Sequence, residues 1–559
     1  MSVQFRRLYR VFLFRVVDLE LLSAGGDVTR LVGQLAVLPV LLGAGFAFGG
    51  LGLRERYPAV LESAWALEHA LIATTMLLTG LFTVLSWEAT FPDLRDAMVL
   101  GPLPVRTREL FFGKLAALCA LQALVPAALN ALPSLAWTLA LAPPSQNLVD
   151  LVLMPQLYRT FAAFWLTMFG ASAFVFLSVL ALQGMLAHLL PRGAMLRISS
   201  WLQLAAFCLF LSAYFLQPVP ATAVALADEV NGQFLAWLPA YWFLGLFQQL
   251  NGSMHAVMQP LAVRADAGPA LVTALALLFN LPGYRRRLRE LVEQPEVVPY
   301  PRRGRPIRLY GFGLSTAILQ FFVRSLTRSR QHRLLLGFYL GAGLSTIILL
   351  IRSGAGRDLL SSLQQTRTAF GSAIVVAAWV LGVRMLVGLP VSLKANWVFR
   401  LTQIGRPIDY HAATRRTLLL VSVTPVALLA PIVFLPLWPW QDAFGHVLLL
   451  VLWAVMLAHA SVIRLRKLPF TCAYQAGKSH VHLRLLALLG GVLLLGKAAE
   501  FEQRAIRDGR MPMLAGAMAG GVCLARELAR RNGGGDVEFD DEPEEAAAGL
   551  GLSRDGFLG

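Results

Sequence analysis

The sequence predicts an all-α polytopic integral membrane protein with about 12 transmembrane helices, grouped as two six-helix halves. Only 14% of the 559 residues are charged and 57% are hydrophobic, and the mean hydropathy is +0.62. Soluble globular domains carry about a quarter charged residues. The apolar stretches approach the roughly 20 residues that a helix needs to cross the hydrocarbon core. The expected spans are 31–53, 66–86, 115–142, 160–187, 201–217, 267–283, 334–351, 370–390, 417–437, 443–463, 481–497 and 511–528.

Positive charge alternates between the gaps that separate these spans. Of the 49 Lys and Arg residues, 38 lie in every second gap, starting with the N-terminal segment, and 11 lie in the others. Because Lys and Arg collect in cytoplasmic loops, we expect both termini in the cytoplasm and a multi-pass protein of the cell inner (plasma) membrane. The gap before the last span opposes this orientation, since it carries Lys497, Arg504, Arg507 and Arg510 on the predicted outer side.

An internal duplication of layout is predicted by two amphipathic segments. Residues 5–16 and 318–331 each place apolar residues on one helical face and Arg on another, which is typical of interfacial helices. Each segment precedes two spans, a polar loop containing proline (87–114 or 384–416) and four more spans. The predicted domains are an N-terminal six-span half (1–283), a basic cytoplasmic linker (284–317), a C-terminal six-span half (318–530) and an acidic, disordered tail (531–559).

The two polar loops carry a resemblance to a known family. The first reads WEATFPDLRD at 87–96 and VLGPLPV at 99–105, followed by Lys114, and the second reads LPVSLKANWVFR at 389–400. Both resemble loops of ABC-2-type exporter permeases, in which an interfacial helix precedes six spans and the loop between spans 2 and 3 docks on a separate ATPase subunit. Most such permeases carry one six-span unit per chain, whereas this chain would carry two fused units.

The resemblance implies coupling loops that contact the ATPase. The residues assigned to these coupling loops are Phe91, Pro92, Asp93, Arg95, Asp96, Pro102, Pro104 and Lys114 in the first loop, and Pro390, Lys394, Asn396, Trp397 and Arg400 in the second. The physical chemistry of the first loop fits this role, because its charges of both signs can pair with those of a docked protein. Pro102 and Pro104 stiffen the connection to the third span.

No catalytic, metal or cofactor motif is evident, so we expect neither an enzyme nor a bound cofactor. Gly477-Lys478-Ser479 lacks the first glycine of a phosphate-binding loop, because that position holds Cys472. The net charge of +17 is spread beside the spans, which favours anionic lipid headgroups over nucleic acid as the partner. The predicted function is a permease subunit of an ABC-type exporter that moves a lipid-like, drug-like or other apolar substrate.

Two other functions stay open on the sequence. A self-contained carrier of the major-facilitator type has the same topology and a long basic central loop, but ionisable residues are scarce inside the spans. A membrane-embedded lipid or glycan enzyme would use an outward-facing acidic pair, for which Asp228 and Glu229 are the candidates.

Overall fold

Most of the residues that the computed structural model describes are helical. The described residues are 3–17, 39–51, 61–92, 96, 98, 103, 105–142, 154–216, 235–252, 256–293, 313–329, 332–341, 343, 362–391, 396, 407–463, 468–472 and 481–531. No strand occurs among them, so the predicted all-α class is confirmed. The chain divides into two compact units, Met1–Tyr300 and Pro301–Gly559, and each is described by itself.

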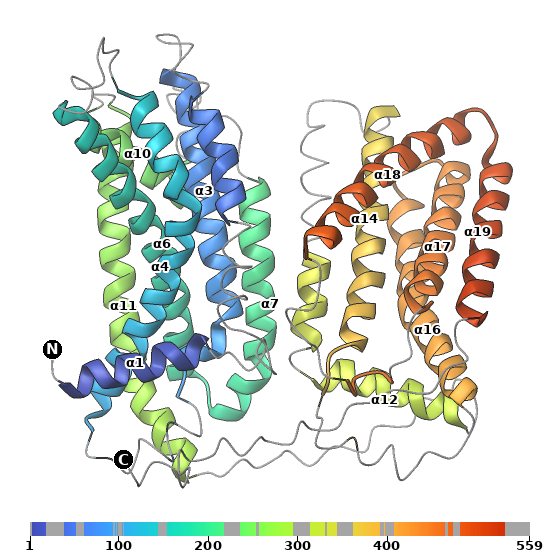
Figure 1. The fold of residues 1–559 in the computed structure, drawn as a ribbon, viewed down its shortest axis with the longest axis horizontal. Helices are drawn as coiled ribbons and strands as arrows, with labels where there is room; N and C mark the ends of the chain where they lie inside the picture. Colours follow the sequence, from blue (N-terminus) through green and yellow to red (C-terminus); the bar gives the residue numbers. More distant parts are fainter. Residues whose placement is uncertain are drawn as a thin grey trace, which may run out of the picture. The chain divides into compact units, whose positions relative to one another are not determined.

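In the first unit, long helices pack side by side and α1 lies across one end of them (Figure 1). The helix α1 packs on α4, while the short helix α10 packs on α3, α6 and α11 at the opposite end. The elements are α1 (Val3–Val17), an unlabelled helix (Pro39–Leu51), α3 (Leu61–Leu85), η1 (Trp87–Thr90), α4 (Thr107–Ala140), α6 (Pro155–Leu189), α7 (Arg192–Leu216), α10 (Pro239–Leu250) and α11 (Met258–Glu293).

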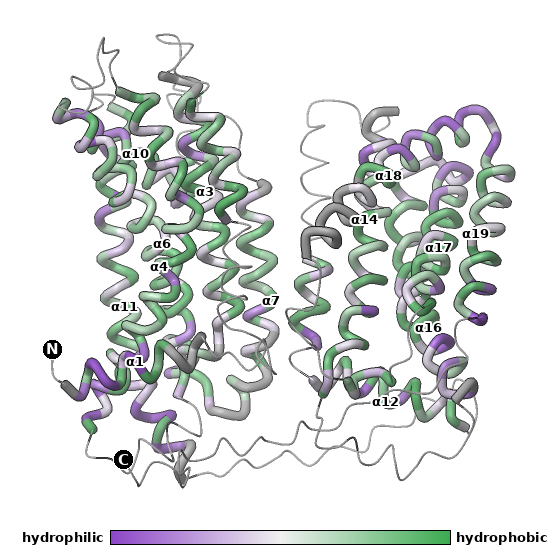
Figure 2. Tube along the Cα trace, in the orientation of Figure 1, coloured by the Kyte–Doolittle hydropathy of each residue, from purple (hydrophilic) through white to green (hydrophobic). Residues whose placement is uncertain are grey.

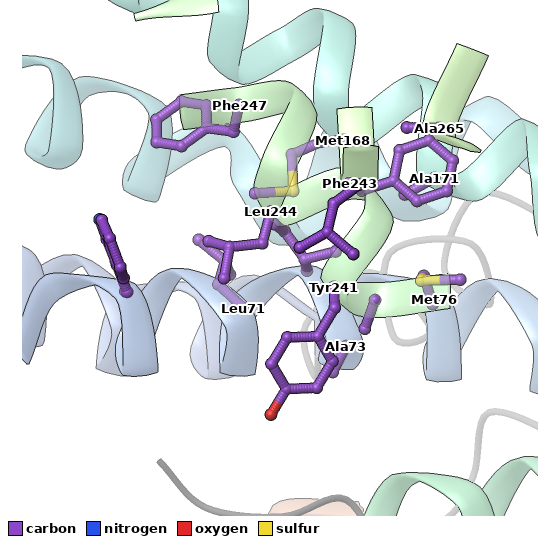
Figure 3. Packing of buried hydrophobic residues seen from close by; sticks show 14 of the residues in the cluster. Leu71, Ala73, Met76, Met168, Ala171, Tyr241, Phe243, Leu244, Phe247 and Ala265 are labelled. Carbon is purple, nitrogen blue, oxygen red and sulfur yellow. The ribbon is translucent and has the colours of Figure 1, made fainter. Parts of the chain in front are cut away.

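The helix α10 carries much of the apolar core of this unit. Tyr241, Phe243 and Leu244 are completely buried, and they meet α3, α6 and α11 in the cluster drawn in Figure 3. Trp237, just before α10, is 80% exposed, whereas Tyr241 and Phe243 point into the protein because α10 packs against the longer helices α3, α6 and α11.

A close helix contact in this unit depends on a proline and a glycine. Pro133, inside α4, has no N–H to donate to the Leu129 carbonyl one turn earlier. The helix Pro39–Leu51 brings Gly43 against that carbonyl, and a Cβ on Gly43 would overlap the Leu129 oxygen. Glycine therefore permits the two backbones to approach at the point where the proline interrupts the hydrogen-bond ladder.

The second unit repeats the arrangement of a helix lying across the end of a bundle, since α12 crosses the ends of its neighbours in Figure 1. Its apolar residues Ile318, Leu319, Phe322 and Leu326 are buried, as predicted, whereas Arg324 and Thr327 are exposed. The labelled elements are α12 (Leu314–Arg328), α14 (Ser362–Val387), α16 (Pro407–Phe434), α17 (Trp440–Val462), α18 (Val481–Arg507) and α19 (Met511–Arg531).

Seven helices in the described part are long and apolar enough to cross a membrane, and the hydrophobic colouring of Figure 2 follows them. They identify the chain as a membrane-embedded protein. The seven are Ala64–Leu85, Thr107–Ala140, Pro155–Leu189, Met258–Glu290, Gln365–Val387, Asp409–Phe434 and Trp440–Val462.

The other five expected spans have different outcomes. Spans 31–53 and 201–217 correspond to the shorter apolar helices Pro39–Leu51 and Trp201–Tyr214. Span 334–351 is described as helix only near its start. The helices α18 and α19 coincide with the last two, but both end in charged turns and neither is among the seven.

Candidate functional site

The first predicted loop is fastened to α4 by a buried ion pair. Lys114 Nζ lies 2.9 Å from Asp96 Oδ2, and the two side chains are only 6% and 1% exposed. The same ammonium donates a hydrogen bond of 2.6 Å to the Phe91 carbonyl oxygen. Lys114 therefore joins two points of the loop to α4, and we call Phe91, Asp96 and Lys114 the loop clasp.

Two further helices contact the loop clasp. Lys114 Nζ lies 5.8 Å from the ring centre of Phe12 on α1, and Phe12 packs against Gly113 of α4. On the other side, the Arg287 guanidinium of α11 lies 4.5 Å from the ring centre of Phe91. Each is a cation–π contact, so the start of the loop is held by α1, α4 and α11 together.

The residue that opens the loop, Trp87, is fully buried and fixes the end of α3. Its indole N–H donates to Ser199 Oγ of α7 at 3.0 Å, and its carbonyl accepts from the Gln183 amide of α6 at 3.3 Å. Gln203 of α7 donates to the Val84 carbonyl at 2.6 Å. Sequence reasoning missed these amides, because polar residues in an apolar helix carry no signal of their partner.

The second predicted loop is braced by a segment from elsewhere in the chain, residues 468–472. The Phe470 N–H donates to the Val387 carbonyl at 2.9 Å, and the Val391 N–H donates to the Phe470 carbonyl at 3.1 Å. The Asn396 amide donates to the Thr471 carbonyl at 2.6 Å. Segment 468–472, which we call the brace, thus contacts the first part of the loop at Val387, Val391 and Asn396.

Phe470 has an unusual backbone conformation for a bulky residue. Its φ of 63° lies in the left-handed region, which costs of order 1–3 kcal/mol for a residue other than glycine. The ring is 1% exposed and contacts the rings of Phe322 and His332 at 5.1 and 5.0 Å. The contacts that bury this ring offset the strain, so the brace has a defined position against α12.

His332 links the brace to the loop through both ring nitrogens. Nδ1 lies 2.6 Å from Ser329 Oγ, and Nε2 lies 3.1 Å from the Leu389 carbonyl oxygen. Since a carbonyl only accepts, Nε2 carries the proton and Nδ1 accepts from the Ser329 hydroxyl. Burial lowers the pKa of His332, and the bond to Leu389 opposes part of that shift.

Six of the thirteen predicted coupling-loop residues lie in the described part. Asp96, Lys114, Asn396 and Pro92 are buried, whereas Phe91 and Pro390 are half-buried. The residues outside the described part are Asp93, Arg95, Pro102, Pro104, Lys394, Trp397 and Arg400. Asp228, Glu229 and Gly477-Lys478-Ser479 also lie outside it.

A buried carboxylate lies at the α10 end of the first unit. Glu68 of α3 is 3% exposed and accepts a 2.5 Å hydrogen bond from the Gln248 amide of α10. Its other oxygen has no partner among the described residues, and neither has Nε2 of the adjacent His69. Buried ionisable groups inside membrane spans mark functional sites more often than structural ones.

In the second unit, hydrogen bonds connect three polar side chains, of which two are buried and one is half-buried. His446 of α17 places Nε2 3.0 Å from Ser372 Oγ of α14 and Nδ1 2.5 Å from Glu502 Oε1 of α18. The order hydroxyl, imidazole, carboxylate is that of a catalytic triad. However, Ser372 also donates to the Ala369 carbonyl, and His446 is 0% exposed between Phe434 and Trp438. These hydrogen bonds connect α14, α17 and α18. Because the Ser372 hydroxyl and the His446 ring are both buried, a substrate has no access to them in this arrangement.

No group of three or more metal-ligating side chains occurs within the described residues. Comparison of the chain with protein-family models, with curated proteins and with solved structures finds no match.

Proposed function

We propose that the chain is the membrane-spanning permease subunit of an ABC-type exporter and that a separate ATPase subunit supplies the energy. In this proposal two six-span halves give twelve spans, both termini face the cytoplasm, and the protein lies in the plasma membrane. The substrate is a lipid-like, drug-like or other apolar molecule, because the long helices offer mainly apolar side chains to one another and to lipid.

The observation that carries this proposal is the loop clasp. A loop that receives force from a partner must be joined to the helix that it moves, and Lys114 joins the loop after α3 to α4. The pair is shielded from solvent, so the linkage is screened little by salt. Contacts from Phe12 and Arg287 extend the same linkage to α1 and α11.

The second unit supports the proposal with a different set of contacts at the corresponding loop. Here the brace and His332 contact Leu389, Val391 and Asn396, and α12 takes the place of α1 beside the loop. Each of the two loops that resemble coupling loops therefore contacts the amphipathic helix and the long helices of its own unit. Such contacts are needed if a partner's movement is to reach those helices.

The test is purification of the full-length chain from its native membranes, followed by azido-ATP labelling of the proteins that accompany it. We expect a labelled ATPase that is lost from the variant Asp93→Arg, because reversed charge opposes docking. The matched control is Asp508→Arg, an exposed residue after α18 on the predicted outer side, which should keep the ATPase. Absence of a labelled partner, or equal retention by both variants, would reject the proposal.

A second candidate function, a cation-coupled carrier, is favoured by Glu68. Scarcity of ionisable residues in the spans was the sequence argument against such a carrier, yet Glu68 is deeply buried with one oxygen unpaired among the described residues. Under this alternative, a proton or sodium gradient drives uptake into vesicles without ATP, and Glu68→Gln abolishes it. Gradient-driven uptake that survives this substitution excludes Glu68 as the coupling group.

A further inference from the structure

A groove of about 630 Å³ lies beside α12 in the second unit. Its walls come from residues 317–329, on α12 and just after it, and from Val391 at the start of the second loop. The groove is therefore formed where the amphipathic helix meets the loop. Its volume is in the range of sites that hold small organic ligands.

The lining of the groove separates into a charged and an apolar part. Arg324 is exposed and makes no ion pair with any described residue, and Gln320 and Ser325 add polar groups on the same helix. Ala317, Phe321 and Val391 supply apolar surface. A guanidinium with nearby hydroxyl and amide groups suits a phosphate, and adjacent apolar surface suits the glycerol and acyl carbons of a lipid.

The walls of the groove are held in place by contacts already described. The Val391 N–H donates a hydrogen bond to the Phe470 carbonyl, and the Phe321 ring lies 5.9 Å from the Phe470 ring. Ser329, just after α12, is hydrogen-bonded to His332. The brace thus fixes the position of Val391 relative to α12, and the groove is a preformed site.

We propose that this groove binds the headgroup of an anionic glycerophospholipid. The helix α12 lies across the ends of α14 and α16, with its apolar face buried against the bundle, which is the position of a helix at the headgroup level of a bilayer. A lipid there brings its phosphate to Arg324 and its glycerol to Phe321 and Val391. The site needs no ATPase, so its test is independent of the proposed function.

The experiment titrates the purified full-length chain with short-chain phosphatidylglycerol and counts bound lipid by native mass spectrometry. We expect saturable binding, with none for short-chain phosphatidylcholine. Arg324→Gln should weaken binding about fivefold, the effect of one arginine on an anionic headgroup. Ala317→Trp, which fills the groove at an exposed position and keeps Arg324, should abolish it. The control Arg10→Gln removes an exposed arginine from α1 and should leave the affinity unchanged.

Four results would overturn the proposal. The first is equal weakening by Arg324→Gln and Arg10→Gln, which would mean attraction to any basic surface. The second is full binding by Ala317→Trp in a chain whose thermal unfolding matches the parent. The third is equal affinity for glycerol phosphate without acyl chains, which would make the groove a site for free phosphate. Binding that appears only after removal of the acidic tail would assign the groove to that tail and would also reject the lipid.

Discussion

Replacing Lys114 by Met removes the cation that faces Asp96 in the first unit. Met keeps the length of the side chain, so packing against Phe12 changes little, but the Asp96 carboxylate, which is 1% exposed, loses the ammonium that lies 2.9 Å from it. Removal of one partner from a buried ion pair costs about 3–5 kcal/mol. The Phe91 carbonyl also loses its 2.6 Å hydrogen bond to the ammonium.

The double variant Lys114→Met with Asp96→Asn separates the ion pair from other effects. With no charge left at the clasp, it should recover about 2 kcal/mol of the loss, within the coupling found for residues of one network. The measurement is the free energy of unfolding of the full chain in detergent, followed by tryptophan fluorescence during denaturant titration. Arg106→Gln, an exposed change near the start of α4, should stay within about 0.5 kcal/mol. A Lys114→Met loss of that small size, or additive effects in the double variant, would refute the clasp.

Three further predictions concern other parts of the chain. Glu502→Ala leaves His446 Nδ1 without its hydrogen-bond partner and should lower the free energy of unfolding by about 1–3 kcal/mol. The control Glu500→Ala removes an exposed ion pair on the same helix and should lower it by about 0–1 kcal/mol. Equal losses would contradict a stabilising hydrogen bond between Glu502 and His446. Gly43→Ala places a Cβ against the Leu129 carbonyl and should destabilise the protein by about 1–3 kcal/mol. The Cβ of Gly45→Ala meets open space, so this control should be neutral or stabilising. A neutral Gly43→Ala would disprove the close approach of the helix Pro39–Leu51 to α4. Because the folded-state pKa of His332 is below its usual 6.5, its contribution to stability is present above pH 6.5 and is lost as pH falls below that value. His332→Gln should flatten this part of the pH–stability curve, and an unchanged curve would contradict a lowered pKa of His332.

The sequence predicted the features that depend on local periodicity. The apolar faces of α1 and α12 follow a period of 3.6 residues, and Leu8, Phe12, Leu319 and Phe322 are buried as the pattern indicates. The long apolar helices were predicted for the same reason. Hydropathy was a poorer guide where polar residues continue a helix, since α7 begins at Arg192 inside the expected gap 188–200.

The contacts that define the candidate site were beyond single-sequence reasoning. Phe470 reaches Val391 across about eighty positions in the chain, and Glu502 reaches His446 across 56. Such pairs depend on how helices meet in space, and no periodic pattern encodes them. Lys114 and Asp96 were both predicted as residues of the first coupling loop, but the sequence did not indicate that they form an ion pair with each other.

The proposed transmission of energy through the first loop is tested by ATP turnover in vesicles that contain the full-length chain and its ATPase. With intact coupling, an apolar substrate should raise ATP turnover by the parent complex. Lys114→Met should abolish this stimulation, because Asp96 and the Phe91 carbonyl then lose their contacts with the Lys114 ammonium on α4. Lys497→Met, which removes an exposed lysine of α18, should keep it. Equal stimulation of the parent and Lys114→Met complexes would contradict a clasp that carries movement from the ATPase to α4.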